Sequence, residues 1–577
     1  MTLIQTRRHA RLKSLLLFFC AFVLCHSSLL LASPSTPASM LDAAASATRA
    51  LQWRNLANAR RDTAPNPVQV ENQRPGTPGW AVLQPSRAGE IQAYAGADSI
   101  NRGQEVQLHV SSNSPYLIQL YRLGYYGGVG ARLMATTLGG FPVDQGAYVY
   151  DLNRGEPVDC PSCITSLKDE KGLETHIRDA NWSVTDTVRF PAQWISGIYL
   201  FKLTNSSGKQ WFVPLVVRDD SARADLVFQV PLNTDQAYNS WGGTSLYKDF
   251  QRAPNGALEP APRAYYVSWN RPYEQNSGSG NVLVWTYAML RFLEEQGYNV
   301  TYTTNNAVAT GATNLFNYKG FVSGGHDEYW SQAERKKLED AINRGVSAAF
   351  FGGNDMYRQV RSYPDLQGRP DRFTAGYDNP PLDPVHALGP LGVPLATGKW
   401  RDPFINYPEA RILVSMYNAI NYHNQDFIVR NTGHWVFTGT GLHDGNAIAG
   451  ILGYEVDGIV GPPHLPVGDE RITIIGQSPF VTADRVPTTR LSVAALRELA
   501  ATHNIVFNAG TLGWVFGLTD THLLYAPVHP TDADGDAPQQ ADPPTVAAPI
   551  PVSPALRQMT NNILQRIVLG VVPTPGH

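Results

Sequence analysis

Several side chains that can bind a metal ion or move a proton follow a short apolar run near the middle of the sequence. The segment FVSGGHDEYW, residues 321–330, breaks at two glycines and then presents His326, Asp327 and Glu328. Imidazole and carboxylate groups serve both as metal ligands and as general acids and bases. Their position after an apolar run and before a helical pattern indicates a functional site.

Polar and aromatic side chains follow two other apolar runs in the same way. Tyr238 and Tyr247 come after LVFQV, and Asn354 comes after AAFFGG. In open α/β sheets, ligands bind beyond the carboxyl ends of the strands. Three strand ends are therefore expected to bring these groups to one edge of a sheet, which indicates a site more strongly than any single motif does.

Two familiar kinds of hydrolase are not indicated at the glycine turn. A nucleophile elbow needs Ser or Cys between its glycines, whereas Ser323 precedes both glycines here. The spacing of His326, Asp327 and Glu328 also differs from the i, i+4 pair of a helical zinc site. The residues alone leave metal binding and proton transfer open as roles for this cluster.

The elements around these residues predict an α/β domain over residues 223–577. Buried strands at 224–230, 298–304, 318–324 and 346–353 alternate with two helical patterns. The second helix is predicted to begin with a capping box of Ser331 and Glu334. This order implies an open, mostly parallel sheet with helices on its faces.

Residues 65–222 carry a different pattern. Short segments that alternate apolar and polar residues, such as EVQLHVSS, are separated by Gly, Asn and Pro. One hairpin is predicted to turn at 205–208. We therefore expect an N-terminal antiparallel β-sandwich before the α/β domain.

The remaining segments predict export and two flexible regions. Residues 1–32 combine a basic start with an apolar run and are interpreted as a signal peptide, with an uncleaved membrane anchor as the alternative. Residues 33–64 are interpreted as a linker. A Pro- and Asp-rich insertion at about 527–553 is predicted to be disordered before a terminal helix.

Cysteine content and charge limit the partners of the protein. Cys160 and Cys163 are the two cysteines outside the signal segment, and in an exported chain a local disulfide is favoured over a redox pair. The net charge of −3 gives no reason to expect nucleic acid as a partner. A membrane is expected only through residues 1–32, if they are not cleaved. Oligomeric state and any partner subunit stay open.

The chain resembles the family of the N,N-dimethylformamidase large (beta) subunit through six motifs in the family's order. These motifs are VENQRPGTPGW, YRLGYYGGVGARLM, DQAYNSWGGTSLY, SWNRPY, GHDEYW and LGYEVDG. The resemblance runs from about residue 65 to the last predicted helix. It implies that the α/β domain resembles class I glutamine amidotransferases without the cysteine of that fold, and that a separate small subunit accompanies the characterised enzyme.

The resemblance also implies a mononuclear ferric ion, Fe(3+), held by two tyrosines and one glutamate. Glu328 corresponds to the glutamate, and Tyr238 and Tyr247 correspond best to the tyrosines. Three nearby tyrosines are rival candidates: Tyr265, Tyr266 and Tyr273. Ferric iron prefers anionic oxygen ligands, and a bound cation can keep tyrosine, whose usual pKa is about 10, deprotonated at neutral pH.

The sequence thus predicts an exported metal-dependent hydrolase of a non-peptide C–N bond in a small amide, located in the periplasm or outside the cell. In this hypothesis His326 or Asp327 takes a proton and Asn354 orients the substrate carbonyl. One alternative is a non-catalytic extracellular protein that binds a carbohydrate or another polymer at the same sheet edge. Another is a C–N hydrolase with a different metal bound by His326 and Asp327.

Overall fold

The structure is a computed structural model that describes residues 64–147, 160, 162–247, 250–252, 258–260, 263–460, 470–482, 486–520 and 550–570. It is a mixed α/β structure with several sheets. The predicted signal peptide, nearly all of the predicted linker and most of the predicted insertion lie outside the described residues. None of the described helices is both long enough and apolar enough to cross a bilayer.

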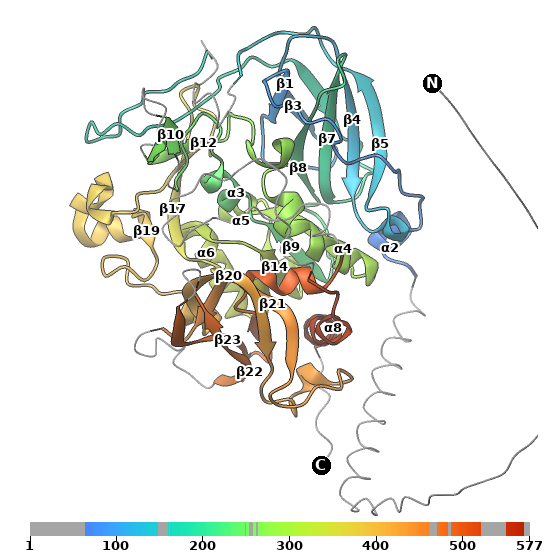
Figure 1. Ribbon diagram of the computed structural model, residues 1–577, viewed down its shortest axis with the longest axis vertical. Helices are drawn as coiled ribbons and strands as arrows, with labels where there is room; N and C mark the ends of the chain where they lie inside the picture. Colours follow the sequence, from blue (N-terminus) through green and yellow to red (C-terminus); the bar gives the residue numbers. More distant parts are fainter. Residues whose placement is uncertain are drawn as a thin grey trace, which may run out of the picture. The chain divides into compact units, whose positions relative to one another are not determined.

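The first eight strands form two sheets over one hydrophobic core (Figure 1). Their bounds are β1 Ile91–Ala95, β2 Ser99–Asn101, β3 Glu105–Ser112, β4 Tyr116–Leu123, β5 Ala131–Leu138, β6 Asp186–Arg189, β7 Gly197–Asn205 and β8 Gln210–Arg218. The sheet orders are β2-β8-β7-β4-β5 and β1-β3-β6, and every pair is antiparallel except β2 with β8. The predicted hairpin at 205–208 is confirmed by the pairing of β7 with β8.

A seven-stranded sheet forms the centre of the α/β region. Its strands are β9 Leu226–Val230, β13 Val300–Thr304, β14 Gly320–Gly325, β16 Ser347–Gly352, β22 Glu470–Val481, β23 Pro487–Leu499 and β24 Ile505–Asn508. The order is β13-β9-β14-β16-β24-β23-β22. The first five strands are parallel to one another, β23 is antiparallel to β24, and β22 is antiparallel to β23. Every residue of the five parallel strands is buried, as expected for strands covered on both faces.

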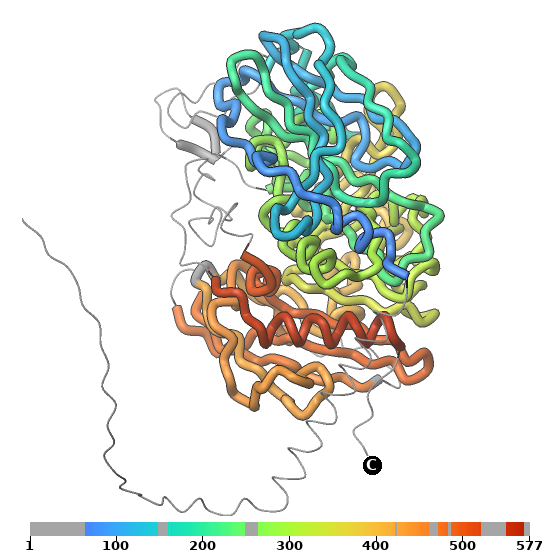
Figure 2. The backbone as a smooth tube through the Cα atoms, turned by 90° about the vertical axis from the view of Figure 1, so that its right-hand side faces the viewer, coloured from blue at the N-terminus to red at the C-terminus, as the bar shows by residue number. Residues whose placement is uncertain are grey.

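Seven α-helices accompany these sheets in the described part of the chain. They are α2 Pro67–Asn72, α3 Leu232–Tyr238, α4 Tyr287–Glu295, α5 Asn305–Thr310, α6 Gln332–Ile342, α7 Ala410–Leu413 and α8 Pro554–Leu569. A π-helical turn, η3 Val282–Thr286, leads into α4. The predicted capping box of Ser331 and Glu334 is confirmed at the start of α6. The predicted terminal helix is α8, the red helix of Figure 2. Its Leu556 and Ile563 belong to the same core cluster as Leu226 of β9.

The remaining strands and 3-10 turns complete the described structure. The strands are β10 Phe250–Arg252, β11 Leu258–Pro260, β12 Tyr266–Ser268, β15 Tyr329–Ser331, β17 Arg358–Tyr363, β18 Phe373–Ala375, β19 Gly398–Lys399, β20 Met416–Ile428 and β21 Ala447–Gly458. The turns are η1 Tyr126–Gly128, η2 Gln275–Gly278, η4 Leu315–Asn317, η5 Pro380–Leu382, η6 Pro384–Leu395, η7 Trp435–Phe437 and η8 Leu512–Gly517. β20 and β21 form a hairpin with irregular register.

A buried ion pair joins the N-terminal sheets to the α/β region. Arg122 of β4 donates to both carboxylate oxygens of Glu294 in α4, at 2.7 and 3.0 Å. Both side chains are fully buried, and the hydroxyl of Tyr302 also donates to Glu294. The predicted domain boundary at 222/223 falls in the connection between β8 and β9, and the division into domains stays a prediction.

Candidate functional site

Three parallel strands end at the candidate site. β9, β14 and β16 lie side by side in the sheet, so their carboxyl ends share one edge. α3 follows β9 and ends in Tyr238, residues 326–328 follow β14, and Asn354 follows β16. The hydroxyl of Tyr238 donates to Oε2 of Glu328 over 2.7 Å. The structure therefore brings together side chains from separate strand ends, as the pattern predicts.

The glycine turn before His326 is required by the close approach of two strands. Gly325 has a φ of 92°, which few residues other than glycine adopt. A Cβ on Gly352 of the neighbouring strand would lie 2.0 Å from the carbonyl oxygen of Gly325. The two glycines let β14 and β16 end together, and this places the residues that follow Gly325 at the site.

Glu328 is a buried carboxylate that receives hydrogen bonds from both sides. Arg358 Nε donates to Oε1 over 3.2 Å, while Tyr238 donates to Oε2. The backbone nitrogen of Glu328 donates to Thr234 Oγ1 of α3. Burial by itself would raise the pKa of Glu328, but the nearby His326 and Arg358, together with the Tyr238 hydrogen bond, lower it below the usual value. Glu328 is therefore ionised at neutral pH.

The rings of Tyr238 and Tyr247 stack on each other. Their centroids lie 4.9 Å apart with an angle of 25° between the planes. Burial raises the pKa of Tyr238 well above its usual value, with the charge of Glu328 adding to the effect, and the same two causes raise the pKa of Tyr247. Both phenols hold their protons at neutral pH unless a cation binds them. The rival tyrosines Tyr265 and Tyr266 stack instead on Tyr377 and Tyr363, and Tyr273 lines a separate small cavity.

His326 lies between two carboxylates. Its Nε2 is 3.3 Å from Oε2 of Glu328 and 3.0 Å from Oε2 of Glu455 in β21. Burial alone would lower the pKa of His326, but the charges of Glu455 and Glu328 outweigh burial and raise it well above the usual value. The imidazole ring of His326 also packs edge-on against the ring of Trp285, with 6.3 Å between the ring centroids. His326 is thus placed to hold a proton between two acids.

Asn354 connects the third strand end to the same acid. Its Nδ2 donates to Oε2 of Glu455 over 2.9 Å, and its backbone nitrogen donates to Asp457 Oδ1 over 2.8 Å. Its φ of 54° is uncommon for a residue with a side chain. The side-chain oxygen of Asn354 has no hydrogen-bond partner among the described residues. Such a strained, half-satisfied amide is typical of a binding position.

Asp327 points into a separate polar network. Its Oδ2 accepts hydrogen bonds from Gln229 and Ser323, both over 2.8 Å, and its Oδ1 accepts one from Asn305 over 3.2 Å. The same two amides also donate to Glu334 Oε1, at 2.9 and 2.8 Å. Burial raises the pKa of Asp327 to about 6. Asp327 and Glu334 thus share donors beneath the loop that carries His326 and Glu328.

The kinds of oxygen that Tyr238, Tyr247 and Glu328 carry suit a hard cation. Two phenols and one carboxylate are the ligand type that ferric iron prefers. The Tyr238 proton now lies between phenol and carboxylate oxygens, and a cation that bound both would replace that proton. Among the described residues, no group of three His, Cys, Asp or Glu side chains is arranged to hold a metal ion. A site of two tyrosines and one glutamate contains only one residue of those four types, so this absence does not bear on it.

One residue of the site, Glu455, was not recognised as a candidate from the sequence. Glu455 stands in the motif LGYEVDG, but the motif by itself does not reveal that its acid faces His326. Arg358, the first residue of β17, forms salt bridges with Glu328 and Asp378.

Comparisons with known proteins identify the family through a family match, and two solved structures are similar only over small parts of the chain. No curated protein matches the chain. A superoxide reductase (neelaredoxin) from Ignicoccus hospitalis is 13% identical, covers 23% of this chain and 82% of its own, and has a TM-score of 0.12. A structure of toxic shock syndrome toxin-1, a bacterial superantigen, is 16% identical, covers 22% and 98%, and has the same TM-score. Neither likeness bears on the fold or the site.

Residues 117–524 match the family described as N,N-dimethylformamidase beta subunit-like, C-terminal. The match covers well over half of the chain and includes every residue of the candidate site, from Tyr238 to Glu455. The resemblance expected from the motifs is thereby confirmed, and the chain belongs to the N,N-dimethylformamidase beta subunit-like family.

Proposed function

We propose that this chain is an exported, metal-dependent hydrolase that cleaves the non-peptide C–N bond of a small amide, as N,N-dimethylformamidase does. The observation that carries the proposal is the 2.7 Å contact of the Tyr238 hydroxyl with Glu328, beside the stacked ring of Tyr247. Membership of a dimethylformamidase-like family supports a hydrolase of the amidase type. The hydrogen bond between Tyr238 and Glu328, with the ring of Tyr247 stacked beside Tyr238, supports a metal site.

Each residue of the site has a defined role in this proposal. Tyr238, Tyr247 and Glu328 would hold a mononuclear ferric ion, which when bound polarises the substrate carbonyl and acidifies a water molecule. Glu455, with His326 at 3.0 Å, accepts the proton that the water loses and returns it to the amine nitrogen as the C–N bond breaks. Asn354 orients Glu455 and the substrate carbonyl.

Asp327 supports the loop in this proposal. Its two oxygens are already occupied by three donors, so they are poorly available to a water molecule or a substrate. The same occupation argues against a different metal bound by His326 and Asp327. Asp327 instead ties residues 326–328 to Gln229 of β9 and Asn305 of α5.

Buried tryptophans favour the enzyme over a polymer-binding protein. A polymer-binding face needs aromatic rings exposed along a surface. Trp241, Trp269 and Trp330 are 1%, 5% and 0% exposed and therefore offer no such face. The polymer-binding alternative gains no support from these residues.

The finer features of the architecture and location belong to the same proposal. We infer that the two N-terminal sheets form a β-sandwich and that the seven-stranded sheet resembles that of class I glutamine amidotransferases. Removal of a signal peptide at 1–32 would leave the mature chain in the periplasm or outside the cell. The substrate is a small-molecule amide, and a small partner subunit would be sought by copurification.

The metal content and the visible spectrum of the purified mature chain test the proposal. We expect about one iron per chain and a visible band from tyrosinate bound to iron. Phenylalanine at position 238 or 247 removes a phenol oxygen but keeps the ring, so Y238F and Y247F should each weaken the band and lower amide hydrolysis.

Tyr265 offers a matched control, because its ring stacks on Tyr377 and not at the site. Y265F should keep the iron, the band and the activity of the wild type. A folded wild-type chain that binds no iron and hydrolyses none of a panel of formamides and acetamides would refute the proposal. A wild-type band in both Y238F and Y247F would show that other tyrosines bind the metal.

A further inference from the structure

The loop that joins the two site tyrosines is closed at its base. Residues 239–246 connect Tyr238, the last residue of α3, to Tyr247. The backbone nitrogen of Leu246 donates to the carbonyl oxygen of Ala237 over 2.9 Å. The two phenols therefore leave the backbone at neighbouring points, and their relative position depends on the shape of this loop.

A buried guanidinium fills the inside of the loop. Arg271 Nη1 donates to the carbonyl oxygens of Trp241 and Thr244 over 2.8 and 3.1 Å. Its Nη2 donates to the carbonyl oxygen of Asn239 over 2.7 Å. The side chain of Arg271 is 1% exposed. One planar, permanently charged group thus gathers three carbonyl groups of the loop around itself.

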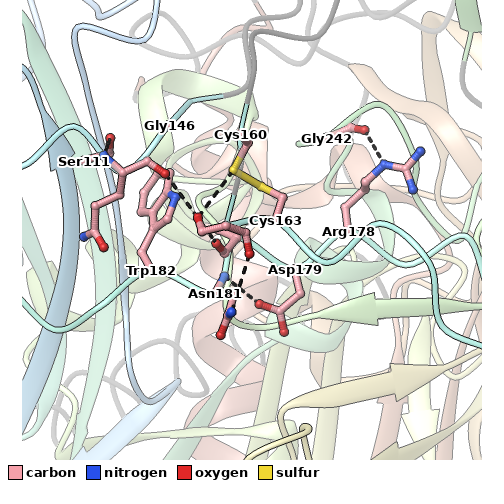
Figure 3. The surroundings of a disulfide bond; sticks show 12 residues. Ser111, Gly146, Cys160, Cys163, Arg178, Asp179, Asn181, Trp182 and Gly242 are labelled. Carbon is pink, nitrogen blue, oxygen red and sulfur yellow. Dashed lines mark hydrogen bonds between the residues drawn. A yellow bond between two sulfur atoms is a disulfide. The ribbon is translucent and has the colours of Figure 1, made fainter.

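A second arginine holds the loop at another carbonyl. Arg178 Nε donates to the carbonyl oxygen of Gly242 over 2.9 Å, as Figure 3 shows. Its stem packs against the same residue, because a Cβ on Gly242 would lie 2.6 Å from Cγ of Arg178. Thr244 adds a hydrogen bond from its hydroxyl to the carbonyl oxygen of His176 over 2.8 Å. Four carbonyl groups of residues 239–244 are therefore held by two arginines.

We propose that Arg271 and Arg178 form an arginine clamp that positions Tyr238 and Tyr247 for metal binding. This inference rests on the proposed role of the two phenols as ligands. The hydrogen bonds of both arginines to the loop go to its backbone carbonyl groups, so both are positioning residues that act through the loop. Arg271, which holds three carbonyl groups, is the principal member of the clamp, and Arg178, which holds one, is the lesser member.

Lysine substitutions separate the geometry of the clamp from its charge. R271K keeps a buried cation, but a lysine ammonium cannot reproduce the planar fork that spans three carbonyl oxygens. Loss of residues that support metal ligands lowers metal affinity about 10- to 100-fold. We expect a fall of that size for R271K, together with a shifted or weaker tyrosinate-to-iron band for each bound iron. R178K should cause a smaller fall.

Arg335 supplies the matched control. Its guanidinium is 1% exposed and donates to the carbonyl oxygens of Tyr407 and Pro408 over 2.9 and 3.0 Å, with no hydrogen bond to residues 239–247 in the described structure. R335K should lower thermal stability without changing iron affinity or the band. Wild-type affinity and band position in both R271K and R178K would overturn the clamp.

Two further outcomes keep the test decisive. If R271K does not fold, the iron affinities of R178K and R335K are compared instead. A lower affinity in R178K alone supports the clamp, and equal affinities overturn it. If the wild type binds no iron, the proposed function fails separately. Hydrogen exchange of residues 239–247 in the metal-free chain then tests the clamp. Faster exchange in R271K than in R335K supports the clamp, and equal exchange in the two variants overturns it.

Discussion

At the scale of single residues, the two acids of the site, Glu328 and Glu455, differ in their partners. Glu328 receives hydrogen bonds from Tyr238 and Arg358, which suits a ligand that must stay ionised. Oε2 of Glu455 lies 3.0 Å from Nε2 of His326 and accepts a hydrogen bond from the side-chain amide of Asn354. This position suits the proposed role of Glu455 as proton acceptor. The two acids therefore have different expected effects when they are neutralised.

Neutralising Glu455 should remove catalysis and leave the metal site intact. E455Q keeps the shape of the side chain but cannot accept a proton, so kcat is expected to fall about 10²- to 10⁴-fold. E328Q removes a proposed ligand and should lose iron as well as activity. Iron analysis and steady-state kinetics distinguish the two variants, and wild-type kcat in E455Q would contradict the assignment.

At the scale of elements, the loop 239–247 is shaped by glycine as well as by arginine. Gly242 has a φ of 87°, and Gly243 has a φ of 85°. Positive φ angles turn the backbone so that its carbonyl groups meet the clamp. At Gly242 the missing side chain also leaves room for the stem of Arg178.

The substitution G242A should therefore cost more than strain in the backbone alone. A positive φ costs an alanine about 1 kcal/mol, and the contact with Arg178 adds to that cost. Gly172 is the matched control, because it has a φ of 80° but a Cβ added there would meet no heavy atom within 4 Å. Chemical denaturation should show G242A to be less stable than G172A, and equal stability would contradict a packing role for Arg178.

At the scale of the whole molecule, buried ionisable groups tie stability to pH. His109 of β3 stacks on Tyr94 at 4.5 Å, and its Nδ1 is 2.7 Å from the carbonyl oxygen of Trp182, so Nδ1 carries the hydrogen. Burial lowers the pKa of His109 to about 4, although the hydrogen bond to Trp182 opposes the shift. The folded state therefore keeps this histidine neutral where the unfolded chain binds a proton.

The sign of the pH effect follows from that difference. Well above pH 6.5 both states are neutral at His109 and the residue contributes no pH dependence. As the pH falls from about 6.5 to about 4, the unfolded state gains a proton first, so the free energy of unfolding decreases. A difference of about 2.5 pH units, at about 1.4 kcal/mol per unit, corresponds to a loss of about 3.5 kcal/mol.

Denaturation of the wild type and of H109Q between about pH 7.5 and about pH 4 measures this effect. Other carboxylates titrate in the same range, but they are common to both proteins. The stability of H109Q relative to the wild type should therefore rise as the pH falls. A difference that does not change with pH would contradict the lowered pKa of His109.

Local sequence patterns were sufficient for the central strands and helices and for part of the site. Continuous apolar runs predicted β9, β14 and β16, and Ser331 with Glu334 predicted the start of α6, because these signals lie within a few residues of one another. His326 and Asn354 were predicted at one edge, since parallel neighbours end together. The two tyrosine positions came from the family motifs.

Only the tertiary structure decided which groups meet. Glu455 reaches His326 through the pairing of β20 with β21, whose irregular register no local pattern encodes. Asp327 faces Gln229 and Asn305, whereas its neighbour Glu328 faces Tyr238, because successive residues leave the chain in different directions. The sequence by itself determined the family, the strand ends and the types of ligand available. Long-range packing decided the partners of each acid and the clamp around residues 239–244, since hydrogen bonds between distant segments depend on the whole fold.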